Sequence, residues 1–262
     1  MTSYHNHTRF SDGSAEIADM VKAAARAGLS EVGISDHLVI HPAGRTFKWA
    51  MPLKRLGEYV AAVRRAAQAA RLPVRLGIEA DFFAATVART RRLLDRHPFD
   101  FVIGSVHFAG GFLVDKSRKS WAELTPARRE AKWRTYWRSV SALARSRAFD
   151  IVGHLDVPKR FGFRMQEEAP RAALLALDAI AESGMALELN TAGWRHPARE
   201  AYPSPALLRA ARERGIPILI SADAHSPADI ARSFGPARRL AREAGYARTV
   251  RFADRKRSFS PL

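Results

Sequence analysis

Two pairs of residues near opposite ends of the chain have the types and the spacing of metal ligands. His5 and His7 flank one asparagine, and Asp223 and His225 flank one alanine. Both pairs lie in short segments that read as β-strands, where residues i and i+2 point to the same face. Each pair can therefore direct two ligand atoms at one cation, although a histidine pair taken alone can also arise by chance.

Further metal-capable side chains recur where other strand-like segments end. The whole set is His5, His7, Asp12, His37, Glu79, His107, His154, Asp223 and His225. The chain has no cysteine, so any metal must be held by histidines and carboxylates. One tetrahedral ion takes only about four ligands. The set therefore predicts two to three divalent ions, and its mixed nitrogen and oxygen ligands suit Zn, Mn or Fe.

The competing interpretation is that these histidines are structural. A single histidine at a strand end is more often structural than metal-binding, and this applies to His107 or His154 alone. The recurrence at so many strand ends favours metal binding for the set. The other histidines lack this pattern: His97 is interpreted as structural, the role of His41 in a loop stays open, and His196 is a candidate for the rim of a site.

The elements that must position these residues alternate along the chain. Apolar strand-like segments alternate with amphipathic helical patterns, several of which end in glycine. The strands are predicted at 3–8, 31–37, 74–82, 100–108, 150–157, 186–193 and 217–225. The helices are predicted at 16–28, 53–70, 85–96, 131–146, 170–184, 204–215 and 230–245. Such alternation predicts an α/β fold with parallel strands, as a closed barrel or an open doubly wound sheet. In both, ligands bind at the carboxyl ends of the strands.

The rest of the chain is predicted to be loop or a minor element. Residues 38–53 and 109–126 read as long loops, which at one end of such a fold are often functional. The tail from residue 249 is expected to add a last short strand. No linker or low-complexity tract interrupts the pattern, so we expect one domain over residues 1–262.

Composition narrows the classes of protein. No apolar run approaches the length of a membrane span, and no secretory signal is recognisable, so we expect a cytoplasmic protein with no membrane partner. The formal net charge is +17. This charge would attract a phosphorylated metabolite or nucleic acid. Because the arginines are dispersed over helix faces, general compositional bias explains the charge equally simply.

Six motifs along the chain resemble those of the PHP (polymerase and histidinol phosphatase) superfamily. They are HNHTRFSDG, SDH, GIEADF, IGSVHF, GHLD and SADAH, spread over residues 4 to about 235. Within the superfamily, WAMPLKRLGEYV, GHLDVPKRFG, LELNTAGWR and YPSPALL are most similar to the histidinol-phosphatase branch. The resemblance implies a distorted (β/α)7 barrel with a trinuclear metal centre at the carboxyl ends of the strands.

The resemblance also implies how the ligands divide among the ions. His5, His7, Glu79 and Asp223 would hold the first ion, and Glu79 would bridge to a second ion held by His107 and His154. His37 and His225 would hold the third. Some relatives complete this third site with a histidine where this chain has Gly13. Asp12 is the expected substitute, and it has a competing role as the cap of the following helix.

The activity implied by the resemblance is hydrolysis of L-histidinol phosphate to L-histidinol and phosphate. A metal-bridging hydroxide would attack phosphorus, and Asp223 or His225 would pass a proton to the leaving alkoxide. Arg160 and Arg195 resemble the phosphate-binding arginines of the family, although each can also be an ordinary surface arginine.

Weaker candidates for substrate contacts are Lys159, Asn190 and Thr191. The substrate ammonium would need a carboxylate, for which Asp156, Glu188 and Asp81 are candidates. Phe10 and Trp49 are candidates to flank the substrate imidazole, with a core role as the competing reading for each.

Two other functions stay open at this stage. The first is a PHP-type nuclease or nucleotide phosphatase that acts on nucleic-acid ends, which the positive charge supports. The sequence has no nucleic-acid-binding motif or stripe of interleaved basic and aromatic residues for it. The second is a metal-binding domain without catalysis, which the intact ligand set disfavours. The oligomeric state cannot be predicted from the sequence.

Overall fold

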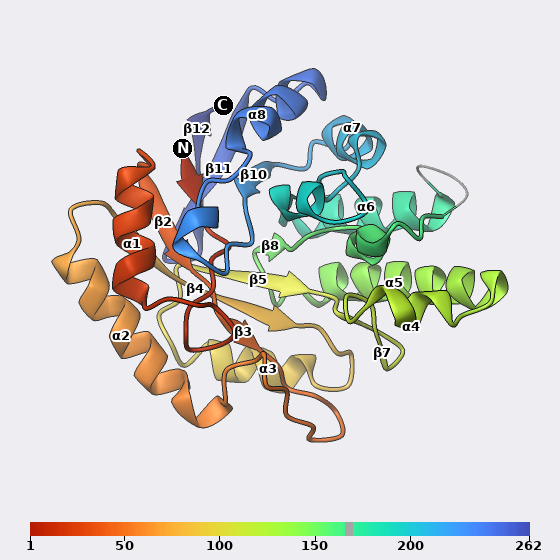
Figure 1. Cartoon of the computed structure of the whole chain (residues 1–262), viewed down its shortest axis with the longest axis horizontal. Helices are drawn as coiled ribbons and strands as arrows, with labels where there is room; N and C mark the ends of the chain where they lie inside the picture. Colours follow the sequence, from red (N-terminus) through yellow and green to blue (C-terminus); the bar gives the residue numbers. More distant parts are fainter. Residues whose placement is uncertain (166–169) are drawn as a thin grey trace.

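A parallel sheet that closes on itself forms the centre of the molecule (Figure 1). This computed structural model describes residues 1–165 and 170–262. β3 (His37–Leu38) pairs with β4 beside the main path of the sheet. The main path runs through β1 (Thr2–Ser3), β2 (Glu31–Ile34), β4 (Val74–Asp81), β5 (Phe101–Ser105), β8 (Ile151–Val152), β9 (Ala186–Asn190) and β10 (Ile218–Ser221).

The sheet closes through the residues that follow its first and last strands. Asn6 forms a parallel bridge with Ala224. The amide of His7 donates to the carbonyl of Ala224 at 2.8 Å, and the amide of Ala224 donates to the carbonyl of His5 at 3.1 Å. The sequence left a barrel and an open sheet as alternatives, and the distorted seven-stranded barrel is confirmed.

Helices surround the sheet on the outside, as Figure 1 shows. They are α1 (Ile17–Arg26), α2 (Leu56–Ala69), α3 (Val87–Leu94), α5 (Pro126–Ser146), α6 (Arg171–Ser183), α7 (Pro205–Glu213) and α8 (Phe234–Glu243). α1 buries Ile17, Met20 and Ala24, the spacing of one helical face. None of the helices that the structure describes is long and apolar enough to cross a membrane.

The predicted helices are all present, with shifted ends. α5 begins five residues before its predicted start because the side chain of Thr125 accepts from the amide of Arg128, and Pro126 fits the first turn. α8 begins at Phe234 rather than at residue 230, after the short helical turn η4 (Pro227–Asp229). A short turn, η1 (Leu53–Arg55), precedes α2.

The segment 109–126 is not the long loop that the sequence predicts. It continues a small antiparallel hairpin, β6 (Phe108–Ala109) with β7 (Phe112–Leu113), and contains α4 (Arg118–Ala122). The side chain of Ser117 caps α4. Such short elements carry too few residues to show a period in the sequence. The predicted loop 38–53 is confirmed over residues 39–52, between β3 and η1.

Bulky side chains fill the interior of the barrel. Tyr4, Phe101 and Ile151 are fully buried there. Phe101 occupies the space beside two glycines: a Cβ on Gly77 would lie 2.1 Å from its ring, and a Cβ on Gly33 would lie 2.6 Å from it. These glycines therefore let the large ring pack in the centre of a narrow barrel.

The tail forms a hairpin rather than one last strand. β11 (Arg248–Ala253) pairs antiparallel with β12 (Lys256–Pro261), outside the barrel sheet. Val250 and Phe252 of β11 pack into the cluster around Tyr4. The amide of Asp254 also bonds the carboxylate of Asp100, just before β5. The hairpin thereby closes the end of the barrel opposite the strand carboxyl ends.

We expect Phe252→Ala to lower the free energy of unfolding by about 3–5 kcal/mol, because it opens a cavity beneath the barrel core. Phe252 is 4% exposed. The matched control is Phe259→Ala in the partner strand, where the ring is 47% exposed and the expected loss is about 1 kcal/mol or less. Urea unfolding of both variants measures the difference. Equal losses in the free energy of unfolding would contradict the role of β11 in closing the end of the barrel.

Candidate metal centre

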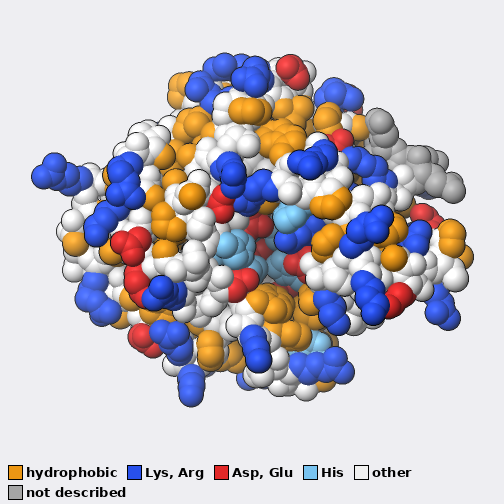
Figure 2. All heavy atoms as spheres, in the orientation of Figure 1, with side chains coloured by type: hydrophobic (Ala, Val, Ile, Leu, Met, Phe, Trp, Pro, Cys, Tyr) orange, Lys and Arg blue, Asp and Glu red, His pale blue; other side chains and the backbone are white. Residues whose placement is uncertain are grey.

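The metal-capable side chains meet in a hollow at the carboxyl ends of the strands. Figure 2 shows pale-blue histidines and red carboxylates at the bottom of this hollow, with lysines and arginines around it. The cavity measures about 580 Å³. Its lining includes Asp12, His37, His107, His154, Asp223 and His225. The predicted ligands, far apart in sequence, are therefore brought together by the closure of the barrel.

Glu79, at 1% exposure, is the central carboxylate of the cluster. Its Oε1 lies 2.9 Å from Nε2 of His154 and 3.8 Å from Nε2 of His107. Its Oε2 lies 3.3 Å from Nε2 of His5, 3.7 Å from Nε2 of His7 and 2.6 Å from Nδ1 of His37. Its two oxygens therefore face different groups of histidines, the arrangement that a bridging ligand requires.

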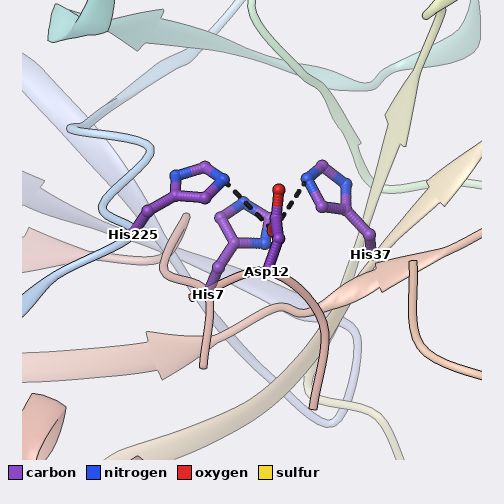
Figure 3. A group of neighbouring side chains, drawn as sticks. All are labelled: His7, Asp12, His37 and His225. Atoms are coloured by element: carbon purple, nitrogen blue, oxygen red, sulfur yellow. Dashed lines mark ion pairs between the residues drawn. The ribbon is translucent and has the colours of Figure 1, made fainter. Parts of the chain in front are cut away.

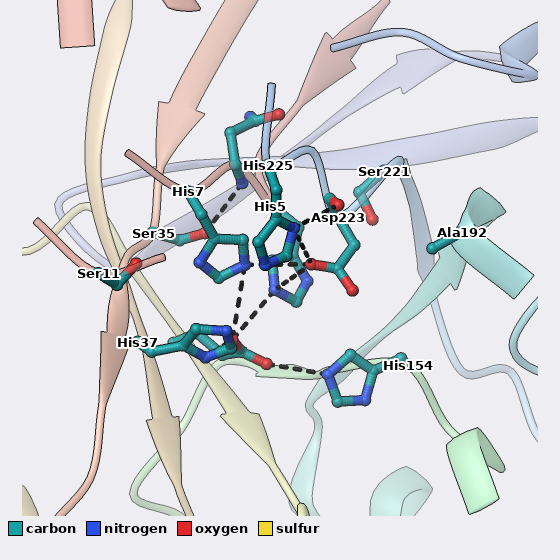
Figure 4. Close-up of polar contacts among 12 residues, drawn as sticks. His5, His7, Ser11, Ser35, His37, His154, Ala192, Ser221, Asp223 and His225 are labelled. Atoms are coloured by element: carbon teal, nitrogen blue, oxygen red, sulfur yellow. Dashed lines mark hydrogen bonds and ion pairs between the residues drawn. The ribbon is translucent and has the colours of Figure 1, made fainter. Parts of the chain in front are cut away.

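Nε2 of His5 and Nε2 of His7 face Oε2 of Glu79. Asp223 lies beside these two rings (Figure 4). Oδ1 of Asp223 lies 3.6 Å from Nε2 of His5 and 3.1 Å from Nε2 of His7. Ligand atoms about 2.0–2.2 Å from one shared ion lie roughly 3–3.5 Å apart. These separations have the size that a shared divalent cation requires. β1 itself ends at Ser3, yet the bridge at Asn6 keeps both histidines on one face.

Asp12 lies among three histidines at the edge of the cluster (Figure 3). Its Oδ1 is 3.6 Å from Nε2 of His37 and 3.3 Å from Nε2 of His225. Ligand atoms of Asp12, His7, His37 and His225 all lie within 4.8 Å of one another. The competing role for Asp12 is wrong, because α1 begins at Ile17 with Glu16 at its N-cap.

Gly13 leaves no room for a histidine beside Asp12. A Cβ on Gly13 would lie 2.4 Å from the carbonyl oxygen of His7 and 2.5 Å from the amide nitrogen of Thr8. A histidine at this position would therefore collide with the backbone. The carboxylate of Asp36 holds the same turn, since it accepts from the amide of Thr8 at 2.8 Å and from the amide of Ser11 at 3.1 Å.

Two buried carboxylates orient the ligand histidines. Oε1 of Glu188 lies 2.6 Å from Nδ1 of His5, and Oδ1 of Asp81 lies 3.0 Å from Nδ1 of His107. In both rings Nε2 then faces the cluster, as in carboxylate–histidine–metal arrangements. Glu188 and Asp81 were candidates for a substrate ammonium, and that interpretation is wrong because both carboxylates are occupied beneath the ligands.

Several buried polar atoms of the cluster lack a hydrogen-bond partner within residues 1–165 and 170–262. They are Nε2 of His5, Nδ1 of His7, Nδ1 of His37, Oε2 of Glu79 and Nδ1 of His154. Buried polar groups are nearly always satisfied, so these atoms need a partner. Nδ1 of His37 and Oε2 of Glu79 are 2.6 Å apart without the alignment of a hydrogen bond. A cation bound by Nε2 of His5 and Oε2 of Glu79, which lie 3.3 Å apart, would satisfy both of these atoms, and this part of the cluster therefore fits divalent metal.

The electrostatics of the cluster also suit cations. Burial alone would raise the pKa of Glu79, but the adjacent His37 and His5 hold it well below its ordinary value. Burial likewise opposes ionisation of Asp223, yet His5 and His7 keep its pKa well below the usual range. Burial, with the nearby His37, lowers the pKa of His7 to about 3, which keeps its ring neutral and able to donate a lone pair.

Two arginines line the cavity beside the metal cluster, as the sequence predicts. Arg160 lies in η2 (Val157–Phe161), and its Nη1 is 3.9 Å from Oδ2 of Asp115. Arg195 ends η3 (Thr191–Arg195), where its Nη1 lies 2.6 Å from Oδ1 of Asp229 and its Nη2 donates to the carbonyl of Ala222. Arg195 is thus held next to Asp223, and Arg160 lines the same cavity.

Lys159 does not point into this cavity. Its amino group is buried and lies 2.8 Å from Asp156 and 2.7 Å from Glu200, and it lines a different cavity beside α5 and α7. Asp156 pairs with Lys159 through Oδ2 and lines that other cavity as well, so neither residue faces the cavity of the metal cluster. The prediction of Lys159 as a substrate contact rested on its place next to Arg160, and in the helical turn η2 neighbouring side chains diverge.

Asn190 also serves the structure rather than the cavity wall. Its side chain accepts from the amide of Ala192 and donates to Glu188 at 3.1 Å. The hydroxyl of Thr191 donates to the carbonyl of Arg232. These contacts hold the end of β9 and the carboxylate that orients His5.

The two aromatic residues predicted to flank the substrate imidazole lie in different surroundings. Trp49 lines the cavity, with its ring centroid 4.9 Å from that of His37. Phe10 is buried against Tyr59 and is a core residue. His196 lines the cavity as a rim residue, whereas His41 packs against Phe83 among aromatic rings outside it.

Comparisons with known proteins agree with this geometry. A relative from Deinococcus radiodurans named a probable histidinol-phosphatase is 42% identical over 240 residues, covering 91% of this chain and 90% of that protein. The histidinol-phosphatase of Bacillus subtilis is 28% identical and covers 86% of this chain and 94% of that protein.

Among solved structures, the histidinol phosphate phosphatase of Lactococcus lactis, in complex with zinc, L-histidinol and phosphate, has the same fold. Its TM-score is 0.82 at 23% identity, with 98% of both chains covered. The sequence profile of the PHP domain matches residues 3–192, which include the first six strands of the barrel and the ligands from His5 to His154. This chain therefore belongs to the PHP domain family.

Proposed function

We propose that this protein is a divalent-metal-dependent phosphatase that hydrolyses L-histidinol phosphate to L-histidinol and phosphate. The observation that carries the proposal is the strand-end ligand cluster around Glu79, which faces a cavity lined by Arg160 and Arg195. The 42% identity to the Deinococcus radiodurans relative supports the substrate. One domain over residues 1–262 and a cytoplasmic location remain parts of this proposal.

We assign two to three ions of Zn, Mn or Fe to the cluster. His5, His7, Glu79 and Asp223 would hold one ion, and Glu79 with His107 and His154 a second. His37, His225 and Asp12 would hold the third. Divalent ions in such a site activate water as a nucleophile and neutralise charge on phosphoryl oxygens.

The guanidinium groups would hold the phosphoryl group. Arginine offers a planar fork of N–H donors that matches phosphate oxygens. Asp229 fixes Arg195 at 2.6 Å, which reduces the entropy that this side chain loses when it binds substrate. Of the two predicted proton carriers, Asp223 contacts His5, His7 and His225 through Oδ1. Within the described residues its Oδ2 has no such contact, so it would take the proton of the attacking water and pass it to the leaving oxygen. His225 is the weaker candidate for proton carrier, because its Nε2 already lies 3.3 Å from Oδ1 of Asp12.

Asp115 is the carboxylate that we assign to the substrate ammonium. It lines the cavity, and its Oδ1 is buried without a hydrogen-bond partner in the described parts of the chain. Its Oδ2 is 3.9 Å from Arg160, so an ammonium bound to Asp115 would lie next to the phosphoryl site. Histidinol phosphate carries both groups on one short carbon chain.

We expect Asp115→Asn to lower kcat/KM for L-histidinol phosphate by about 10–100-fold, because it removes a charge-assisted hydrogen bond in a largely buried site. Hydrolysis of phenyl phosphate, which has no ammonium, should change by about threefold or less. Steady-state phosphate release measures both substrates. Equal losses on the two esters would contradict the assignment of Asp115.

The experiment that tests the proposed function is phosphate release over a panel of monoesters. The wild-type protein should hydrolyse L-histidinol phosphate at least about 100-fold more efficiently than phenyl phosphate or glycerol phosphate. A 5′-phosphorylated oligonucleotide belongs in the panel because it tests the nuclease alternative. Equal rates on all esters, or faster release from the oligonucleotide, would contradict the proposal.

A further inference from the structure

Tyr202 lines the proposed active-site cavity and carries a buried hydroxyl without a hydrogen-bond partner among the described residues. The residue is 2% exposed and lines the cavity together with Arg160 and Asp223. Its hydroxyl oxygen is buried and has no hydrogen-bond partner among the residues that the structure describes. A buried hydroxyl without a partner lowers the free energy of unfolding, because it loses its hydrogen bonds to water on folding. A phenylalanine at the same position would avoid this loss.

The backbone on both sides of Tyr202 is held by several contacts. Tyr202 and Asn190 exchange two backbone hydrogen bonds of 2.7 and 3.0 Å, which attach the residue to the end of β9. The ammonium of Lys159 donates to the carbonyl of Ala201 at 2.7 Å, and Asp156 accepts from the amide of Ser204 at 3.0 Å. The buried Lys159–Asp156 pair therefore positions the segment that carries Tyr202.

The ring of Tyr202 is fixed as well. It lies against Gly193 of η3, where a Cβ would be 3.0 Å from Cζ of Tyr202 and 2.0 Å from the carbonyl oxygen of Glu200. Only glycine leaves room for the ring and for the backbone at Glu200 at this point. The ammonium of Lys159 lies 5.5 Å from the ring centroid, on the side of the second cavity. The phenol is thus placed with little freedom to turn towards another partner.

Arg160, like Tyr202, has a buried hydrogen-bond donor that lacks a partner within the described residues. This donor is its Nε, and its guanidinium lines the same cavity. Both groups can donate a hydrogen bond, and burial keeps the pKa of Tyr202 above its ordinary value, so the phenol stays protonated. Two unsatisfied donors on one wall, beside a centre that binds cations, suit an anionic group between them.

We infer that the hydroxyl of Tyr202 is a substrate contact that donates a hydrogen bond to the phosphoryl group, alongside Arg160. This inference rests on the proposed phosphatase function and deepens it by adding a residue to the phosphoryl site. It also gives a role to the Lys159–Asp156 pair, which acts through Tyr202 as a positioning element and does not touch the substrate.

Tyr202→Phe tests the inference because it removes one oxygen and keeps the ring. We expect kcat/KM for L-histidinol phosphate to fall about 10–100-fold, the range for a lost hydrogen bond to a charged group. The inhibition constant of inorganic phosphate should rise by about the same factor, while that of L-histidinol should stay within about twofold. Metal content should be unchanged, and the melting temperature should be equal or higher.

Tyr246→Phe is the matched control. Tyr246 is also buried with a hydroxyl that has no partner in the described residues, but it lies beside Arg212 and lines a different cavity, whose lining contains none of the proposed metal ligands. The Tyr246→Phe protein should have an equal or higher melting temperature and the same kcat/KM as the wild type.

Several results would overturn the inference. A Tyr202→Phe protein that is as active as the wild type, or that is inhibited by phosphate to the same extent, would contradict the contact with the phosphoryl group. A markedly lower melting temperature would show that the hydroxyl bonds another group of the protein and has a structural role. Wild-type protein inactive on L-histidinol phosphate would instead contradict the proposed function, and phosphate binding by calorimetry would then test Tyr202 alone.

Discussion

Glu79→Gln is expected to lower kcat/KM for L-histidinol phosphate by about three orders of magnitude or more. Glu79 contacts five histidines of the cluster through its two oxygens, so it belongs to more than one group of ligands. The amide of glutamine keeps the shape but removes the negative charge and places an N–H donor against ring nitrogens. Binding of at least one ion should be lost, because a neutral amide is a poor bridging ligand.

Metal analysis of the purified variant, together with the phosphate-release rate, checks this result. Glu58→Gln is the control, since Glu58 lies on the surface of α2, where it pairs with Arg55. Its metal content should be unchanged, and its activity should stay within about twofold of the wild type. A Glu79→Gln protein with full metal content and near-normal activity would refute the central place of this carboxylate.

Arg160→Met is expected to lower kcat/KM by about 100-fold or more, because it removes a charged fork of donors from a phosphate dianion. The change also leaves Asp115 without its positive neighbour at the cavity wall. Metal content should not change, since no ligand of the cluster contacts Arg160 within the described residues. The loss should appear as weaker inhibition by phosphate as well as slower turnover.

The control for Arg160 is Arg171→Met, an exposed arginine at the start of α6. It removes the same charge from a strongly basic chain without touching the cavity, so it separates a local contact from general attraction of anions. The expected change at moderate salt is about twofold or less. Equal losses in the two variants would show that net charge, rather than the position of Arg160, governs phosphate binding.

The gathering of these metal-capable side chains could be predicted from sequence because parallel strands place their carboxyl ends at one edge. His5 and Glu79 are far apart in the chain, yet each ends a strand or lies just beyond one, and the barrel brings them together. The ligand types follow from the absence of cysteine. The structure adds that Gly13 leaves no room for a histidine beside Asp12.

Residues that act through other residues could not be predicted in this way. Glu188 and Asp81 occupy strands as ordinary acidic residues, and only the structure reveals that they hold ligand rings. Lys159 is adjacent to Arg160 in sequence, but the turn of η2 directs it to Asp156 and Glu200. Asp115 and Tyr202 lie in irregular segments, where no periodicity relates sequence position to the cavity.

The end of the barrel opposite the site was also beyond prediction. The tail of the chain reads as one short strand, because β12 is largely exposed and shows no clean alternation. Its role depends on Val250 and Phe252 meeting Tyr4, a contact between the two ends of the chain. Such long-range packing leaves no local signal in the sequence.

The most direct test of the account is the rate of phosphate release from L-histidinol phosphate as a function of bound metal. The protein should be stripped with a chelator, checked by elemental analysis, and reloaded stepwise with Zn or Mn. The account predicts that the stripped protein is inactive and that activity returns as ions are restored, up to two or three per chain. A stripped protein that keeps its activity on L-histidinol phosphate would contradict it.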